Sequence, residues 1–309
     1  MDNESGKKDI QMKKMAPLFV LLAGCLWGSM GIFVRGLNVY GFDSMDIVFL
    51  RVFGAMLVLG LWMLFFDRKK FRIRRKDIWC FIGTGVISIV FFNYCYFSTI
   101  QLTSLSIAAI MLYTAPAIVT ILGIFLFKES FRPVKIIALL LAFAGCVLVT
   151  GVLTDGAVLT PIGMLLGLGS GFGYAMYSIF GRYATEKGYT SVTISFYTFL
   201  FGMAGTCFFV KPFSITEIIR QHPSCMPLVL GLVLFNTLAA YICYTIGLSY
   251  MEAGKASILA SVEPVVASLI GFLLYKENMD GMTLAGVVLV LVSAVIVNLS
   301  PANQKSGEM

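Results

Sequence analysis

The sequence predicts an all-α membrane protein whose ten transmembrane helices form an inverted five-plus-five structural repeat. The composition is the first indication, because 59% of the residues are hydrophobic and 13% are charged, whereas a soluble domain has about 25% charged residues. The apolar residues also lie in continuous blocks of about 20 residues, the length that spans a bilayer as a helix. Finally, the second half of the chain repeats the sequence pattern of the first half.

Ten apolar spans follow one another, joined by polar connections. At about 1.5 Å per residue, each is long enough to cross a hydrocarbon core of about 30 Å. The spans lack the alternation of apolar and polar residues that is typical of a transmembrane β-barrel, so helices are predicted. They cover residues 16–35, 45–66, 77–100, 104–127, 133–152, 161–182, 191–211, 226–250, 254–275 and 281–299.

The spans divide the chain into two repeats and two tails. The sequence up to residue 14 is polar and basic, so we expect it to be disordered. The expected parts are a basic cytoplasmic tail (1–15), a first five-helix repeat (16–152), a second, inverted five-helix repeat (161–300) and a cytoplasmic tail (301–309).

The distribution of positive charge predicts the orientation. With the N-terminus inside, eighteen of the 23 Lys and Arg residues fall in cytoplasmic segments and four fall outside, in agreement with the positive-inside rule. We therefore expect a multi-pass protein of the cytoplasmic membrane with both termini in the cytoplasm. The same asymmetry explains the net charge of +7, so a nucleic-acid partner is not expected.

The repeat is clearest in the fourth and ninth spans. Residues 113–129 (YTAPAIVTILGIFLFKE) and 261–277 (SVEPVVASLIGFLLYKE) match at an offset of 148 residues, with Pro116 opposite Pro264 and a Lys-Glu pair at each end. The third and eighth spans match at the same offset. The first and sixth match at 147, which pairs Trp27 with Tyr174, Phe33 with Phe180 and Arg35 with Arg182.

A unit of five spans has an important consequence for topology. Because five is an odd number, the second copy must enter the membrane upside down. Inverted repeats of this kind are common in secondary transporters, where the binding site lies between the halves near the bilayer midplane.

Several short motifs lie in a characteristic order along the chain. They are Leu26-Trp27-Gly28, Phe49-Leu50-Arg51, the two proline-centred spans that end in Lys-Glu, and the Gly-containing stretches at 142–145 and 285–286. In this arrangement the chain, from Leu18 to about Ser300, resembles the EamA-type branch of the drug/metabolite transporter superfamily. The resemblance implies a ten-helix transporter of small polar metabolites, often amino acids. It also implies alternating access around a central cavity lined by the first, third, fourth, sixth, eighth and ninth spans.

Glu263 is where the two repeats differ, because its counterpart is Ala115. A carboxylate near the midplane is costly and usually functional, so Glu263 is a candidate to bind a substrate ammonium group or to carry a coupling proton. The alternative is a structural glutamate that helps to satisfy the backbone freed by Pro264. Pro116 and Pro264 are each expected to kink their helix and to expose carbonyl groups to the cavity.

A second group of candidates carries aromatic rings or amides. Phenol and amide groups are unfavourable when they face lipid but suit a hydrated cavity for an amphipathic solute. The alternative is that they bond to helix carbonyls inside the bundle or lie in the interfacial belt. The candidates to line the cavity are Trp27, Asn93, Tyr96, Tyr113, Tyr174, Tyr177, Asn236, Tyr241 and Tyr244.

Other charged residues receive structural interpretations. Arg51 lies about two turns inside the second span, and we expect an anchor that snorkels outward or pairs with Asp46 rather than a ligand for a substrate carboxylate. The Lys-Glu pairs at 128–129 and 276–277 are expected to be interface anchors or gate salt bridges.

Neither a metal site nor a cofactor is expected. The seven cysteines have no CxxC spacing, and the single histidine, His222, lies in a polar loop. The glycines of LLGLGSGFGYA lie within an apolar span and no GK[ST] follows them, so ATPase machinery is not indicated. Uphill transport would then use an ion gradient or exchange, with protons or a counter-substrate as candidate partners.

The resulting hypothesis is a secondary active transporter that moves a small-molecule metabolite across the membrane by alternating access, with amino acid or amine export as the leading case. A multidrug or toxic organic cation exporter is the alternative, because aromatic faces also bind cations. A membrane enzyme acting on lipid-linked substrates is a remote alternative, since the sequence has no cluster of His, Asp, Cys or Ser at one membrane face.

Overall fold

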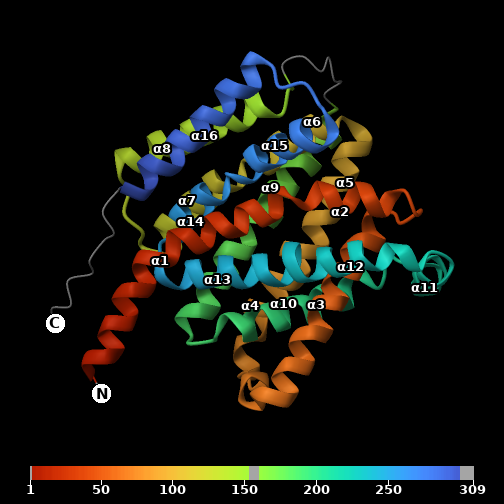
Figure 1. The fold of residues 1–309 in the computed structure, drawn as a ribbon. Helices are drawn as coiled ribbons and strands as arrows, with labels where there is room; N and C mark the ends of the chain where they lie inside the picture. Colours follow the sequence, from red (N-terminus) through yellow and green to blue (C-terminus); the bar gives the residue numbers. More distant parts are fainter. Residues whose placement is uncertain (1, 153–159, 300–309) are drawn as a thin grey trace.

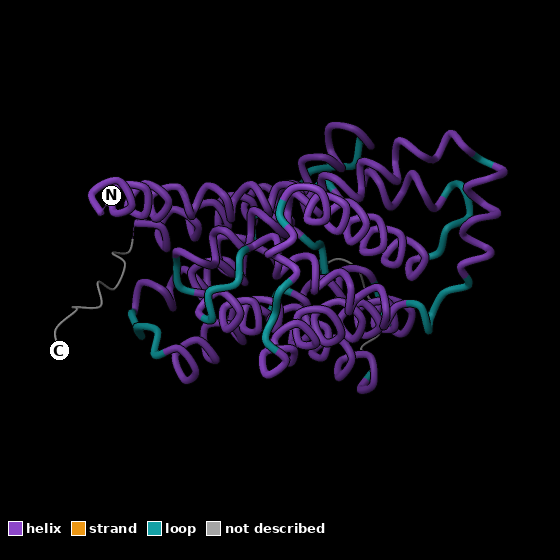
Figure 2. Tube along the Cα trace, turned by 90° about the horizontal axis from the view of Figure 1, so that it is seen from below, coloured by secondary structure: helices purple, strands orange, loops and turns teal. Residues whose placement is uncertain are grey.

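The computed structural model describes residues 2–152 and 160–299, and this part of the chain consists of helices joined by short loops, without strands (Figures 1 and 2). The predicted all-α membrane fold with a five-plus-five repeat is confirmed. Eight segments are long and apolar enough to cross a membrane: Ile10–Asn38, Ser44–Phe66, Arg75–Leu102, Leu105–Phe127, Pro161–Glu186, Pro223–Tyr250, Ala253–Tyr275 and Gly281–Leu299. The remaining two predicted spans are shorter helices, α8 (Pro133–Val149) and α10 (Ser191–Thr206).

The first repeat contains eight α-helices, of which several form broken spans. Its elements are α1 (Asp2–Gly28), α2 (Met30–Asn38), α3 (Ser44–Phe66), η1 (Arg68–Phe71), η2 (Arg75–Asp77), α4 (Ile78–Ile82), η3 (Gly83–Phe91), α5 (Phe92–Leu102), α6 (Leu105–Leu112), α7 (Ala115–Phe127) and α8.

The second repeat is built similarly, but its first span is the single helix α9 and an additional helix, α11, lies in a connection. Its elements are α9 (Pro161–Glu186), α10, α11 (Pro212–Gln221), η4 (Pro223–Cys225), α12 (Met226–Gly231), η5 (Leu232–Ala239), α13 (Ala240–Tyr250), α14 (Ala253–Ala260), α15 (Glu263–Tyr275) and α16 (Gly281–Leu299).

One expectation about the N-terminal segment was wrong. Instead of a disordered tail, residues from Asp2 onward continue the first helix, because extending an existing helix avoids the unfavourable nucleation step and Lys, Glu, Gln and Met are good helix formers. The first span is also not continuous, since α1 ends at Gly28 and α2 begins at Met30. The expected tail at 301–309 lies outside the described residues.

The proline-centred spans break at equivalent places. In the first repeat α6 ends at Leu112 and α7 begins at Ala115, and adding the offset of 148 gives the end of α14 and the start of α15. Each second half-helix carries its proline within its first two residues, where a missing backbone N–H costs nothing. Both half-helices end on a lysine in the left-handed conformation, Lys128 (φ 54°) and Lys276 (φ 56°).

The π-helices η3 and η5 show the inverted relation between the repeats. They lie at matching positions, and each begins a close crossing with the first span of the other repeat. A Cβ on Gly83 would lie 2.2 Å from the ring of Phe180, and one on Gly231 would lie 2.2 Å from the ring of Phe33. Because Phe33 and Phe180 are repeat counterparts, the two crossings are copies of one contact.

The last helices of the two repeats, α8 and α16, pack side by side along one edge of the molecule (Figure 1). A Cβ on Gly145 would lie 2.8 Å from the carbonyl oxygen of Gly286, and one on Gly286 would lie 2.7 Å from that of Gly145. Farther along the pair, the Ser293 hydroxyl donates to the Ala138 carbonyl at 2.6 Å. Small residues therefore allow the two backbones to approach closely.

Candidate functional site

The broken first span lies directly against the broken ninth span. Gly24 and Gly28, one turn apart on α1, make the approach possible, since a Cβ on Gly28 would lie 2.5 Å from the carbonyl oxygen of Glu263. The gap between α1 and α2 is held by Asn236 on η5, whose amide donates to the Leu26 carbonyl and, at 3.0 Å, to the Ser29 hydroxyl. Two helix breaks thus meet inside the bundle, as in many secondary transporters.

Glu263 is the first residue of α15, so its carboxylate lies at the positive end of a half-helix. The Tyr174 hydroxyl donates to Glu263 Oε2 at 3.1 Å. Within the described residues, no Lys or Arg nitrogen lies within 4.0 Å of this carboxylate. The side chain is half-buried, so one face of it remains accessible.

An aromatic group surrounds Trp27, the residue before the end of α1. Its ring is 8% exposed and contacts Tyr174, Tyr241 and Tyr244 at centroid distances of 6.2, 5.4 and 5.3 Å. Two of these contacts have edge geometry, the arrangement favoured by the ring quadrupoles. We call Trp27, Tyr174, Tyr241 and Tyr244 the central cluster.

Arg51 touches the central cluster from α3. Its side chain is buried, with Nη2 donating to the Tyr241 hydroxyl at 3.3 Å and Nη1 lying 3.3 Å from the sulfur of Met30. Its Nε has no partner, and no carboxylate of the described chain lies within 4.0 Å of the guanidinium. A buried cation without a direct ion pair is unfavourable, and the hydrogen bonds of this side chain go only to the neutral groups of Tyr241 and Met30.

Neither of the two contacts expected for Arg51 as an anchor is present. The side chain does not snorkel outward, because it is 5% exposed. It does not pair with Asp46 either, because the Asp46 carboxylate accepts from the Asp43 backbone and so completes the N-terminal cap of α3. Arg51 was therefore missing from the expected site, although an arginine inside an apolar span was a visible signal.

The other candidates are placed as follows. Several bond within the protein: Asn93 donates to the Ile89 carbonyl of its own turn at 2.7 Å, Tyr177 bonds Thr245 at 2.7 Å, and Tyr244 bonds Ser178 at 2.7 Å. Tyr96 packs on Phe92, which in turn packs on Tyr174. Tyr113, at the α6–α7 break, packs beside Val262 and Val265 next to Glu263. The part that each residue plays in transport stays a prediction.

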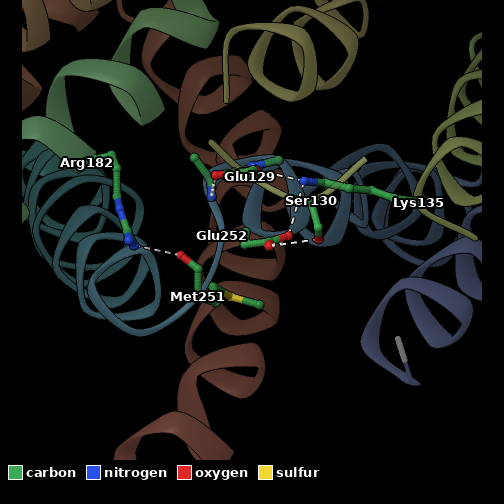
Figure 3. Close-up of polar contacts among 8 residues, drawn as sticks. Glu129, Ser130, Lys135, Arg182, Met251 and Glu252 are labelled. Atoms are coloured by element: carbon green, nitrogen blue, oxygen red, sulfur yellow. Dashed lines mark hydrogen bonds and ion pairs between the residues drawn. The ribbon is translucent and has the colours of Figure 1, made fainter. Parts of the chain in front are cut away.

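A second polar group, the Lys135 network, lies at the end of the bundle where α7 and α13 end (Figure 3). Lys135 Nζ contacts Glu129 Oε2 at 2.7 Å and Glu252 Oε2 at 3.2 Å. Glu129 also accepts from the backbone N–H groups of Ala253 and Gly254, at 2.5 and 3.2 Å. Since Glu129 and Lys135 belong to the first repeat and α14 to the second, these buried bonds tie the repeats together.

The opposite end of the bundle carries a simpler and more exposed contact. Arg35 Nη1 lies 2.7 Å from Glu277 Oε1, with both side chains about half exposed at 51% and 49%, and the guanidinium also lies over the ring of Tyr275. Nearby, Asp280 accepts from the Thr283 backbone at 2.8 Å, and this hydrogen bond lowers the pKa of the Asp280 carboxyl.

Comparison with known proteins gives matches along nearly the whole chain. The EamA-like transporter family matches twice, at residues 14–151 and 161–299. An uncharacterized transporter of Archaeoglobus fulgidus is 28% identical over 282 residues, covering 90% of this chain and 94% of the relative. The uncharacterized transporter YwfM of Bacillus subtilis is 24% identical, covering 94% and 96%.

One relative carries a name that states a substrate. The threonine/homoserine exporter RhtA of Salmonella typhimurium is 25% identical over 206 residues, covering 66% of this chain and 65% of the relative. Among solved structures, one crystal structure superposes with a TM-score of 0.74 at 18% identity, covering 93% of this chain and 97% of that one. This last similarity shows the fold alone.

Proposed function

The chain belongs to the EamA-like transporter family and is a multi-pass membrane transporter rather than an enzyme, and from this premise we propose that it is a secondary active transporter for amino acids. In this proposal it exports its substrate across the cytoplasmic membrane by alternating access, with both termini in the cytoplasm. The charge distribution of the loops supports the orientation, and the similarity to RhtA supports export.

The observation that carries the proposal is a pair of opposite charges around one aromatic cluster, neither of them in an ion pair. Arg51 bonds Tyr241, Tyr241 packs on Trp27, Trp27 packs on Tyr174, and Tyr174 bonds Glu263. An amino acid at neutral pH carries a carboxylate and an ammonium group, so it supplies both missing partners. Binding would compensate two charges that the protein leaves unpaired within the membrane.

The central cluster suits the rest of such a ligand. Aromatic rings give apolar contact to a side chain and attract an ammonium group through their faces. Cationic drugs could use the same rings together with Glu263, and this makes a toxic-cation exporter the second candidate. Arg51 distinguishes the two, because a buried guanidinium repels a cationic ligand and attracts a zwitterion.

The energy for uphill movement would come from an ion gradient or from exchange. Glu263 is the proposed carrier of a coupling proton, because it is a half-buried carboxylate without a cationic partner in the described chain. A group of this kind can bind a proton or the substrate ammonium in alternation, which would couple their movements.

The experiment that tests the proposal is counterflow in proteoliposomes made with the purified full-length protein. Vesicles loaded with one unlabelled compound are assayed for uptake of labelled amino acids, decarboxylated amines and lipophilic cations, with protein-free vesicles as the control. We expect amino acid uptake that exceeds the control several-fold. Uptake of lipophilic cations alone would support the second candidate, and no uptake of any class would contradict transport of these substrates.

A further inference from the structure

We propose that Lys135 and Glu252 form a one-sided lock that keeps the transporter closed at the predicted cytoplasmic end, so that its resting state opens to the opposite side. This inference deepens the proposed alternating-access function and rests on it. It follows from comparing the Lys135 network with its repeat counterpart, and not from the identity of the substrate.

Glu129 and Glu277 are counterparts with the same local backbone. Each follows a left-handed lysine, and each donates its N–H to a glycine carbonyl six residues earlier at 3.1 Å, Gly123 in one case and Gly271 in the other. Their carboxylates nevertheless have different partners. Glu129 caps the N-terminus of α14, whereas Glu277 pairs with Arg35.

The arginines at the two ends also have different partners. Arg182 is the counterpart of Arg35, but it does not pair with Glu129. Its Nε pairs with Glu186 of its own helix at 3.0 Å, and its Nη1 donates to the carbonyls of Leu248 and Met251 at the end of α13, both at 3.0 Å. Figure 3 shows the contact with Met251. The two ends of the molecule therefore display the two arrangements of a single contact: a glutamate that caps a half-helix of the other repeat, and a glutamate that pairs with an arginine.

We infer that the transporter opens when the two ends exchange these two arrangements. In an inverted repeat, the second state is obtained when each half adopts the conformation of the other. Glu129 would then leave α14 and pair with Arg182, while Glu277 would leave Arg35 and cap α6 at Leu105 and Ser106, the counterparts of Ala253 and Gly254. In the structure described here, the Ser104 hydroxyl caps α6 by accepting from the Ile107 N–H at 3.2 Å.

The two ends differ in the side chains that would stabilise closure. At an offset of 148 residues, Lys135 corresponds to Thr283 and Glu252 corresponds to Ser104. Closure at the Lys135 end thus places a buried ammonium group between two carboxylates. Closure at the Arg35 end would form only the cap of α6, with a threonine beside it. Separating a buried charge from its partners is strongly unfavourable, so the equilibrium favours the state in which the Lys135 end is closed.

The test exchanges these residues between the repeats. The double variant Lys135→Thr/Glu252→Ser gives the first end the residues of the second, and Ser104→Glu/Thr283→Lys does the reverse. Hydrogen–deuterium exchange of the full-length protein in nanodiscs is followed at residues 250–256 and 104–108, which contain the two capped helix starts. The measurement requires no substrate, so it can fail or succeed independently of the amino acid proposal.

The lock predicts opposite changes at the two ends. In Lys135→Thr/Glu252→Ser, exchange at 250–256 should be about tenfold faster, because local opening of this segment becomes more populated. Exchange at 104–108 should be slower in the same variant. Ser104→Glu/Thr283→Lys should slow exchange at 104–108 by a similar factor and accelerate it at 250–256. The exposed control Glu217→Ser, on α11, should change neither segment by more than about twofold.

Two results would overturn the inference. Exchange rates within about twofold of the parent protein at both ends, in both double variants, would show that these side chains do not bias the conformation. Faster exchange at both ends together would indicate general loosening. The second double variant distinguishes the lock from a folding defect, because it is expected to increase protection at 104–108, which a folding defect would lower.

Discussion

At the scale of single residues, the site is defined by two charged side chains, neither of which has an ion-pair partner within 4.0 Å in the described chain. Arg51 and Glu263 each bond a tyrosine hydroxyl, and both tyrosines pack on Trp27. A neutral hydroxyl compensates a charge only partly, so each group retains affinity for a ligand of opposite sign. This property turns a structural cluster into a candidate binding site.

Arg51→Gln should distinguish binding of the substrate carboxylate from binding of its ammonium group in a transport assay. Because the variant loses a charged hydrogen bond to the substrate carboxylate, the KM for amino acids should rise by about 10- to 100-fold. Inhibition by the corresponding decarboxylated amine should change by less than about threefold, since an amine has no carboxylate. Equal effects on both compounds would instead assign Arg51 to the structure of α3. Arg220→Gln, on exposed α11, serves as the matched control.

Glu263→Gln should uncouple transport from the proton gradient. The amide keeps the size of the side chain and can still accept from Tyr174, but it cannot bind and release a proton. Uptake driven by a pH gradient should fall to the level of protein-free vesicles, while exchange between equal substrate concentrations continues at a measurable rate. Gradient-driven uptake equal to that of the parent protein would remove Glu263 from the coupling step. Glu217→Gln is the control.

Some positions of these residues in the fold could be predicted from the sequence, and others could not. The mismatch of Glu263 with Ala115 was visible in the repeat, and the carboxylate does lie at a helix break. The partners of Tyr177 and Tyr244, by contrast, are hydroxyls on other helices. Such pairings depend on the rotation of each helix about its axis, which an apolar run without polar faces does not define.

At the scale of elements, prolines and glycines determine where the helices break and cross. The α6–α7 and α14–α15 breaks were predictable, because Pro116 and Pro264 cannot donate a backbone hydrogen bond. The break at Ser29 was not, since no proline is present. The Leu26 carbonyl there accepts from the Ser29 hydroxyl at 2.7 Å and from Asn236 of the distant π-helix η5. Helix α11 was missed for another reason: a short amphipathic segment between spans resembles a polar loop.

The crossing at Gly83 provides a test of the packing. Gly83→Ala places a methyl group where the ring of Phe180 lies, and overpacking of this kind lowers the free energy of unfolding by about 1–3 kcal/mol. Gly231→Ala should have a similar effect through Phe33, because the two crossings are copies. Gly31→Ala is the matched control, since no atom lies within 4 Å of the added carbon. Thermal unfolding in detergent would show the loss, and equal stability of all three variants would contradict it.

At the scale of the whole molecule, an even number of crossings places the start of α1 and the end of α16 at one end. Two contacts support this arrangement: Ala16 on α1 lies against Gly247 on α13, and Lys255, at the start of α14, donates to the Asn298 carbonyl of α16 at 3.1 Å. Helix α13 ends, and α14 begins, beside the Lys135 network. The positive-inside rule predicts that this end faces the cytoplasm.

Tags on the two termini should therefore respond alike to protease. In right-side-out membrane vesicles both tags should be protected, and in inverted vesicles both should be cleaved. A tag at Phe213 on α11, which is 91% exposed, should show the opposite pattern because it lies at the Arg35 end. Cleavage of one terminal tag in right-side-out vesicles would contradict the ten-span topology.

The seam between α8 and α16 has a consequence for which parts of the molecule remain still. The repeat offset maps Gly145 onto Ser293 and Gly286 onto Ala138, so the glycine contact and the serine–alanine contact are images of each other. An interface that is its own image looks the same after the halves exchange their shapes. The contacts of Glu129 and Glu277 must change in that exchange, but those of the seam need not. We therefore expect α8 and α16 to act as a fixed pivot, with the rest of each half turning around it.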